Sequence, residues 1–105
     1  MNYKLTQLKS KELIPGFHGK LIHTLNMSLA FWEVDKDSIV PEHSHMNEQV
    51  MQVLEGKFEF TVNGNSAIYV PGDLVVIEPG AIHSERALTT CKLMDIFSPT
   101  REEYK

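Results

Sequence analysis

The sequence predicts an all-β fold, either a sandwich or a barrel, from three observations. Short runs rich in branched and aromatic side chains recur along the chain, whereas helical periodicity is hard to find. Glycine and proline return about every eight to sixteen residues between Pro41 and Pro99, which is typical of strands joined by tight turns. Residues 57–62 alternate strictly between polar and apolar side chains and precede Asn63-Gly64, a strong indicator of a hairpin.

The individual strands follow from the same features. The two runs before residue 35 are rich in leucine, isoleucine and aromatic residues, so they favour an N-terminal pair of strands. The later runs end at turns that contain glycine, often directly after proline. The tail, residues 98–105, is predicted to form a short helix or a closing flap. The predicted strands are residues 20–25, 27–34, 49–54, 57–62, 66–70, 74–77, 81–86 and 89–97.

Composition limits the kind of protein. The 105 residues are 42% hydrophobic and 23% charged, which predicts one domain over residues 1–105 with a buried core. The net charge is −4 and there is no basic cluster, which argues against nucleic acid and anionic membranes as partners. The one cysteine, Cys91, excludes an intrachain disulfide and a multi-cysteine zinc site. Because no apolar run is long enough to span a membrane or form a signal peptide, we expect a cytoplasmic protein.

Two of the five histidines stand at a spacing that suits a metal site. One residue separates His43 from His45, and in extended backbone two such side chains project from the same face. A metal needs further ligands, and both Glu48 and Gln49 offer an oxygen a few residues downstream. His83 follows a tight turn, as a ligand on a second hairpin would. From these residues alone, either Glu48 or Gln49 completes the set.

Strand parity predicts the lining of the interior. If Gln49 faces inward, Met51 and Val53 do so as well, because alternate residues of a strand share a face. Phe31 and Trp32 are neighbours in a predicted strand and face opposite ways, so one of the two can line a cavity.

The last predicted strand places a carboxylate within an apolar run. Asp95 is preceded by Leu93-Met94 and followed by Ile96-Phe97, and a buried carboxylate is costly unless it is paired or bound to a metal. Asp95 therefore either faces solvent, where Arg101 can pair with it, or points into a polar cavity together with Phe97. In the second case Arg101 offers a planar, bidentate grip on the carboxylate of a substrate.

The histidine motifs resemble the two conserved motifs of the cupins. The segment from His43 to Gly56 (His-x-His, three residues, Gln49, six residues, Gly) is similar to the first motif, with glutamine where glutamate is common. The segment from Gly72 to His83 (Gly, five residues, Glu-Pro-Gly, two residues, His) is similar to the second motif. This resemblance implies a double-stranded β-helix, that is a jelly-roll barrel.

The same resemblance implies a metal centre and an assembly. One divalent transition metal, which could be Zn, Ni, Fe, Mn or Cu, would lie inside the barrel. Small cupins are commonly homodimers, so a homodimer is expected here. The implied metal ligands are His43, His45, Gln49 and His83.

The C-terminal residues make the resemblance more specific. The sequence Asp-Ile-Phe-Ser-Pro-Thr-Arg-Glu-Glu-Tyr, residues 95–104, is similar to that of small single-domain cupins of the pectin degradation protein family. Members of this family linearise 4,5-unsaturated uronates, the monosaccharides left by pectin and alginate breakdown. The resemblance implies that Asp95, Phe97 and Arg101 are the catalytic residues and that the partner is a small carboxylated sugar.

Other functions stay open at this point. A different metal-dependent cupin enzyme, such as an Fe(II) dioxygenase, could use three histidines and an oxygen donor. A non-catalytic cupin could bind a small molecule or a metal without turnover.

Overall fold

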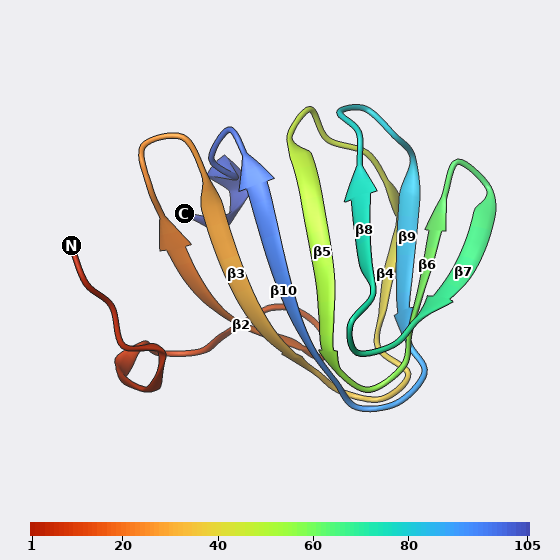
Figure 1. Cartoon of the computed structure of the whole chain (residues 1–105), viewed down its shortest axis with the longest axis horizontal. Helices are drawn as coiled ribbons and strands as arrows, with labels where there is room; N and C mark the ends of the chain where they lie inside the picture. Colours follow the sequence, from red (N-terminus) through yellow and green to blue (C-terminus); the bar gives the residue numbers. More distant parts are fainter.

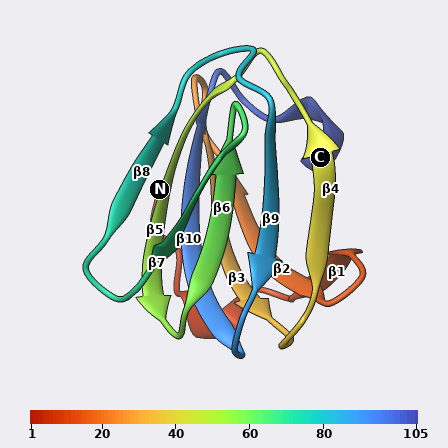
Figure 2. The same cartoon turned by 90° about the vertical axis from the view of Figure 1, so that its right-hand side faces the viewer.

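The computed structural model describes all residues, 1–105, and confirms the all-β jelly-roll prediction. One sheet has six strands, in the order β1-β2-β3-β10-β5-β8, and the other has four, in the order β4-β9-β6-β7. Every strand pair is antiparallel, and the two sheets face each other across the interior (Figures 1 and 2). The strands are β1 (Lys11–Ile14), β2 (Phe17–His23), β3 (Ser28–Val34), β4 (Ile39–His43), β5 (Glu48–Glu55), β6 (Phe58–Val62), β7 (Asn65–Tyr69), β8 (Leu74–Ile77), β9 (His83–Ala87) and β10 (Cys91–Ser98).

Local chemistry accounts for the hairpin β6–β7. Asn63 and Gly64 both adopt positive φ, 49° and 83°, as a two-residue turn of the mirror-image type requires. Asparagine tolerates this left-handed conformation and glycine adopts it without strain. The turn sets the register, so that Phe60 lies opposite Ala67. The predicted hairpin is confirmed.

The interior follows the predicted strand parity. Gln49, Met51 and Val53 on β5 are all buried, whereas Glu48 is exposed on the opposite face. On β3, Trp32 is the inward member of its pair and Phe31 is only partly buried.

Gly19 makes room for the Trp32 indole. Gly19 lies opposite Trp32 in the pairing of β2 with β3. A Cβ atom at Gly19 would lie 2.6 Å from the indole ring, a distance that side chains do not tolerate.

Two strands were not among the predicted ones. β1 is a short edge strand that pairs only with β2. Its first two residues are exposed and its last two are partly buried, so its sequence shows no apolar alternation. β4 contains Pro41, which suits the start or edge of a strand, but its five residues show no apolar alternation. β4 is at the edge of its sheet, and its register with β9 shifts between Val40 and His43, so Pro41 lies where a missing N–H is tolerated.

The termini carry the only helical segments, two 3-10 turns of three residues each, η1 (Leu5–Gln7) and η2 (Glu102–Tyr104). Neither turn has the length or the apolar character that a membrane crossing by a helix demands. η2 matches the predicted short helix in the tail.

Candidate metal centre

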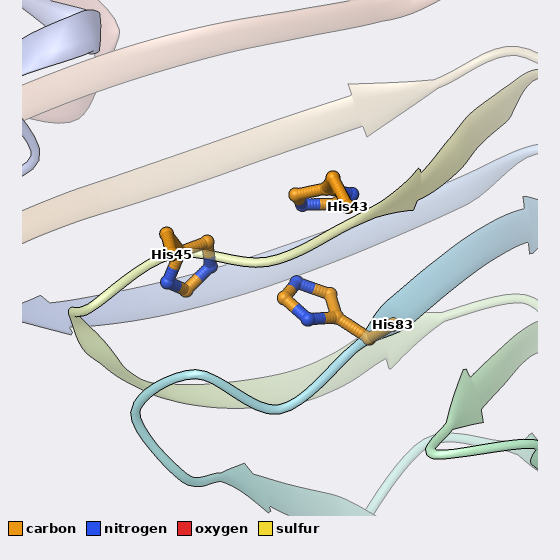
Figure 3. A group of neighbouring side chains, drawn as sticks. All are labelled: His43, His45 and His83. Atoms are coloured by element: carbon orange, nitrogen blue, oxygen red, sulfur yellow. The ribbon is translucent and has the colours of Figure 1, made fainter.

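Three histidines converge inside the barrel. His43 ends β4, His83 begins β9 directly opposite it, and His45 lies in the segment that follows β4 (Figure 3). One ring nitrogen from each lies within 4.8 Å of the others. His45 lies outside the strand, so the loop that leads to β5, and not extended backbone alone, directs it to the same point.

All three histidines are held in the same tautomer. In each case Nδ1 lies at hydrogen-bonding distance from a backbone carbonyl two residues away, and a carbonyl oxygen can only accept. Nδ1 therefore carries the proton and Nε2 keeps a lone pair, the arrangement usual for metal-binding histidines. The distances are 2.8 Å from His43 to Pro41, 3.0 Å from His45 to Asn47 and 2.9 Å from His83 to Ala81.

Gln49 presents its oxygen to this cluster. Its Nε2 donates to Asp95 Oδ1 at 3.0 Å, which places Oε1 3.0 Å from His45 Nε2. With the proton of His45 on Nδ1, two lone pairs face each other across this distance. Burial, followed by the charge of Arg101, lowers the pKa of His45, so a proton on Nε2 does not resolve the contact near neutral pH. A metal cation bound by both atoms would resolve it.

His83 gives a second indication of a metal site. Its Nε2 is buried and has no hydrogen-bond partner, and burial lowers the pKa of His83 to about 4. A buried, unsatisfied lone pair costs free energy unless a ligand uses it. Three imidazole lone pairs and one amide oxygen form a neutral donor set that fits a divalent transition metal.

Asp95 lies inside the barrel and not on its surface. Its neighbours in register are Ala30 on β3 and Met51 on β5, so the diagonal neighbours Trp32 and Gln49 reach its carboxylate. Trp32 Nε1 donates to Oδ2 at 3.0 Å, and Gln49 donates to Oδ1. Burial raises the pKa of Asp95 to about 6, although the two hydrogen bonds oppose this shift.

Glu85 is a second interior carboxylate, which sequence reasoning missed. It shares the inward face of β9 with His83 and lies opposite Val40 and Phe60, both buried. No protein group donates to it or pairs with it. Burial, followed by the charge of Asp95, raises the pKa of Glu85 well above its usual range. Its parity with His83 is the feature of the sequence that could have indicated it.

Phe97 and Arg101 lie beside the histidines. The Phe97 ring meets the His45 ring edge-on, with 5.8 Å between centroids. The Arg101 guanidinium carbon lies 5.7 Å from the centre of the Phe97 ring, and its Nε is buried without a partner. Arg101 does not pair with Asp95, the surface alternative considered above, but forms an ion pair with Glu103.

Tyr104 completes the wall of the cavity, and sequence reasoning gave it no role. Its ring meets Trp32 and Phe97 edge-on, at 5.8 Å and 5.6 Å between centroids. The Arg101 guanidinium lies over its face, 5.1 Å from the ring centre. Burial raises the pKa of Tyr104 to about 12, so the hydroxyl stays neutral.

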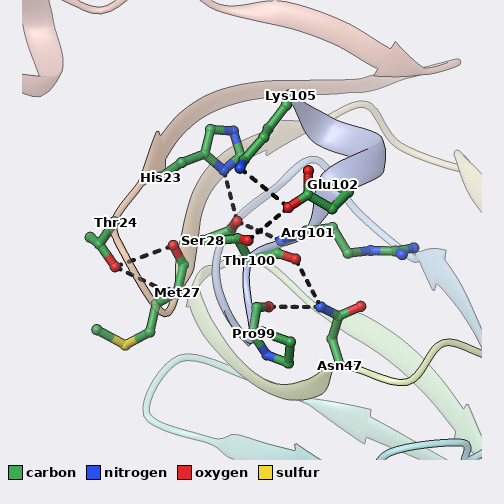
Figure 4. Close-up of polar contacts among 10 residues, drawn as sticks. All are labelled: His23, Thr24, Met27, Ser28, Asn47, Pro99, Thr100, Arg101, Glu102 and Lys105. Carbon is green, nitrogen blue, oxygen red and sulfur yellow. Dashed lines mark hydrogen bonds and ion pairs between the residues drawn. The ribbon is translucent and has the colours of Figure 1, made fainter.

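Asn47 and Ser28 anchor the start of the C-terminal segment (Figure 4). Asn47 Nδ2 donates to the carbonyls of Pro99 and Thr100, at 2.7 Å and 3.2 Å. The backbone N–H of Arg101 donates to Ser28 Oγ at 2.7 Å. Because the Asn47 carbonyl also accepts from His45, the same residue links the histidine cluster to the segment that carries Arg101.

The cavity between these groups is small. It has a volume of about 20 Å³, which is room for a metal ion or one water molecule. The functional side chains that line it are His43, His45, Gln49, Glu85, Asp95, Phe97 and Tyr104.

The interior groups predict opposite pH effects on the stability of the metal-free protein. The pKa of Asp95 is raised from 3.8 to about 6, so the folded state holds its proton more tightly and stability falls as pH rises across this window. The pKa of His83 is lowered from 6.5 to about 4, so His83 makes stability rise between those values. We expect the two effects to offset each other in the wild type.

Urea denaturation in the presence of EDTA, between pH 4 and pH 7, measures how the free energy of unfolding of the metal-free protein depends on pH. Asp95→Asn removes the falling contribution of Asp95 and leaves that of Glu85 in place, so the free energy of unfolding of this variant should increase more steeply with pH than that of the wild type. Glu42→Gln, which changes an exposed carboxylate, serves as the control and should follow the wild type. Parallel curves for Asp95→Asn and the wild type would contradict the shifted pKa of Asp95.

Comparison with known proteins gives a family and several similar structures. The model of the Cupin domain family matches residues 30–97. KdgF from Halomonas sp. is 24% identical with a TM-score of 0.93, and the alignment covers 100% of this chain and 98% of that one. An RmlC-like cupin from Shewanella frigidimarina is 25% identical with a TM-score of 0.93, covering 98% and 94%. No curated protein sequence gives a significant match.

A larger enzyme contains the same fold as one part of its chain. A variant of salicylate 1,2-dioxygenase from Pseudoaminobacter salicylatoxidans is 19% identical with a TM-score of 0.75, and the alignment covers 79% of this chain and 26% of the enzyme. The resemblance to cupins that the histidine motifs carry is confirmed by these matches. With the family model matched over both motifs and the barrel formed as expected, the chain belongs to the cupin family.

Proposed function

We propose that this cupin is a metal-dependent enzyme that opens the ring of 4,5-unsaturated uronates, small sugar acids from pectin or alginate breakdown. The observation that carries the proposal is one cavity lined by His43, His45, Gln49 and Asp95, with His83 beside these histidines and Arg101 packed on two aromatic rings of the cavity wall. The resemblance of residues 95–104 to the pectin degradation protein family supports the substrate class, and so does the similarity to KdgF over the whole chain.

The metal would be held by His43, His45, His83 and Gln49. When bound, it would supply Lewis acidity toward the oxygens of the substrate. Because all four side chains are neutral, none of them cancels the charge of the cation.

Arg101 is suited to bind the carboxylate of the substrate. Its guanidinium is always charged, and a planar fork matches a carboxylate in a bidentate way. The rings of Phe97 and Tyr104 fix its position, and its Nε has no protein partner, whereas its Nη1 pairs with Glu103. Phe97 shapes the wall between Arg101 and His45.

Asp95 is suited to move the proton. With a pKa near 6, it is largely ionised at neutral pH and can still take up a proton readily. In ring opening, Asp95 would accept the proton of the anomeric hydroxyl while the bond from the anomeric carbon to the ring oxygen breaks. The resulting enolate then takes a proton back from Asp95 at C4, the carbon of the former double bond that does not carry the oxygen. The reaction is an isomerisation and needs no co-reactant.

The test is an assay on unsaturated galacturonate with protein loaded with Zn²⁺, Ni²⁺ or Mn²⁺. We expect the absorbance of the conjugated double bond to disappear, and EDTA-treated protein to be inactive. Protein loaded with Fe(II) is tested in parallel for oxygen uptake. Oxygen consumption without loss of the double bond would contradict the proposal and favour a dioxygenase.

A further inference from the structure

The cavity is too small for the proposed substrate. Pockets for small organic ligands measure roughly 300–1,000 Å³, whereas the cavity beside the histidines measures about 20 Å³. A metal ion fits this space but a sugar ring does not. Part of the wall must therefore move before a sugar acid can reach Asp95.

Tyr104 is the part of the wall that the C-terminal tail supplies. It comes from η2, whereas the barrel strands and the loop after β4, which carries His45, supply the other functional groups of the lining. Its ring packs against the core, where it meets Trp32 and Phe97 edge-on. Contacts of this kind are each worth a factor of about 2 to 12 in an equilibrium constant.

The hydrogen bonds of the tail indicate where a hinge lies. The side chains of Asn47 and Ser28 hydrogen-bond to the backbone of residues 99–101, the last of these bonds being the one from the Arg101 N–H (Figure 4). Beyond that point, the polar contacts of residues 102–105 stay within the tail itself. The boundary between the two parts is Arg101.

We propose that Tyr104 is a gating and positioning residue: residues 102–105 turn about Arg101 and lift the Tyr104 ring from Trp32 and Phe97 to admit a ligand, and in the closed form the same ring fixes the Arg101 guanidinium. The proposal rests on the proposed function for the size and the identity of the ligand that must enter. The motion of the gate also controls access of a chelator to the metal, which allows a test without any substrate.

The first experiment measures the rate at which EDTA removes Zn²⁺ from the loaded protein. Tyr104→Ala should raise this rate about tenfold, since it removes two aromatic contacts of the closed gate. The equilibrium affinity for Zn²⁺ should not change, because Tyr104 does not contact the histidines. Tyr104→Phe keeps the ring and should restore the wild-type rate. Tyr3→Ala, which changes an exposed tyrosine at the other terminus, is the matched control.

The second experiment uses Trp32, the one tryptophan of the chain, as a built-in reporter of the gate. The indole is 4% exposed and contacts Tyr104, so Tyr104→Ala should shift its emission to longer wavelength. Galacturonate, which lacks the double bond and does not react, should shift the emission of the wild type in the same direction. Tyr104→Leu provides an apolar replacement in case the alanine variant does not fold.

The outcomes separate the gate from the proposed function. If Tyr104→Ala and Tyr104→Leu lose Zn²⁺ to EDTA at the wild-type rate, the gate is wrong, whatever the substrate. If calorimetry detects galacturonate binding and the Trp32 emission does not change, the opening motion is wrong as well. If galacturonate does not bind and the chelation rates change as expected, the gate stands and the proposed ligand class fails.

Discussion

Replacing His83 with alanine is expected to abolish metal binding. His83 would supply one of only three imidazole ligands, and its Nε2 is the buried lone pair that no protein group satisfies. Outer-shell changes already lower metal affinity about 10-fold to 100-fold, so loss of a direct ligand should lower it by more than about 100-fold. Metal content after dialysis and competition with a chromophoric chelator measure the effect.

A surface cluster provides the control for this experiment. Glu12, His18 and Asp35 also bring their ligand atoms within 4.8 Å of one another, although they are exposed or half-buried. His18 Nε2 lies at hydrogen-bonding distance, 3.2 Å, from Asp35 Oδ2, so this side chain has a partner without a metal. His18→Ala should leave metal binding unchanged. The interior site would be wrong if His18→Ala removed the metal and His83→Ala kept it.

Local patterns predicted the strands whose signal is contained in neighbouring residues. The alternation of residues 57–62 and the conformational freedom of Asn63 and Gly64 are properties of a few adjacent residues, so the hairpin β6–β7 could be predicted directly. Parity could also have decided between Glu48 and Gln49. Gln49 shares its face with the apolar Met51 and Val53, and this is the face that the structure buries.

Features that depend on distant pairing could not be predicted in the same way. The hydrogen bonds to Asp95 come from residues 63 and 46 positions away in sequence, Trp32 and Gln49. They exist because β10 lies between β3 and β5, an order that no local pattern gives. Tyr104 contacts the same region only because the tail folds back over the barrel, so its sequence neighbours do not indicate a role.

Replacing Asp95 with asparagine is expected to abolish turnover while metal stays bound. Asparagine keeps the shape of the side chain and removes the group that would accept the proton, a loss worth about 10²-fold to 10⁴-fold in rate for a general base. Asp95 is held by Gln49 but is not itself one of the proposed ligands, so the protein should still retain metal when the assay is run at saturating metal. Absorbance at the double bond gives kcat, and metal analysis of the same sample gives occupancy.

The pH profile separates loss of a base from a structural defect. A base must be ionised to act, so the wild-type rate should rise with pH through the pKa of Asp95, which is about 6 without metal and lower beside a bound cation. The residual rate of Asp95→Asn should lack this rise. Glu48→Gln, on the exposed face of β5 next to Gln49, should retain both the wild-type rate and the rise with pH. Wild-type turnover in a metal-loaded Asp95→Asn variant would remove Asp95 from the mechanism, because asparagine keeps the shape of the side chain but cannot accept the proton.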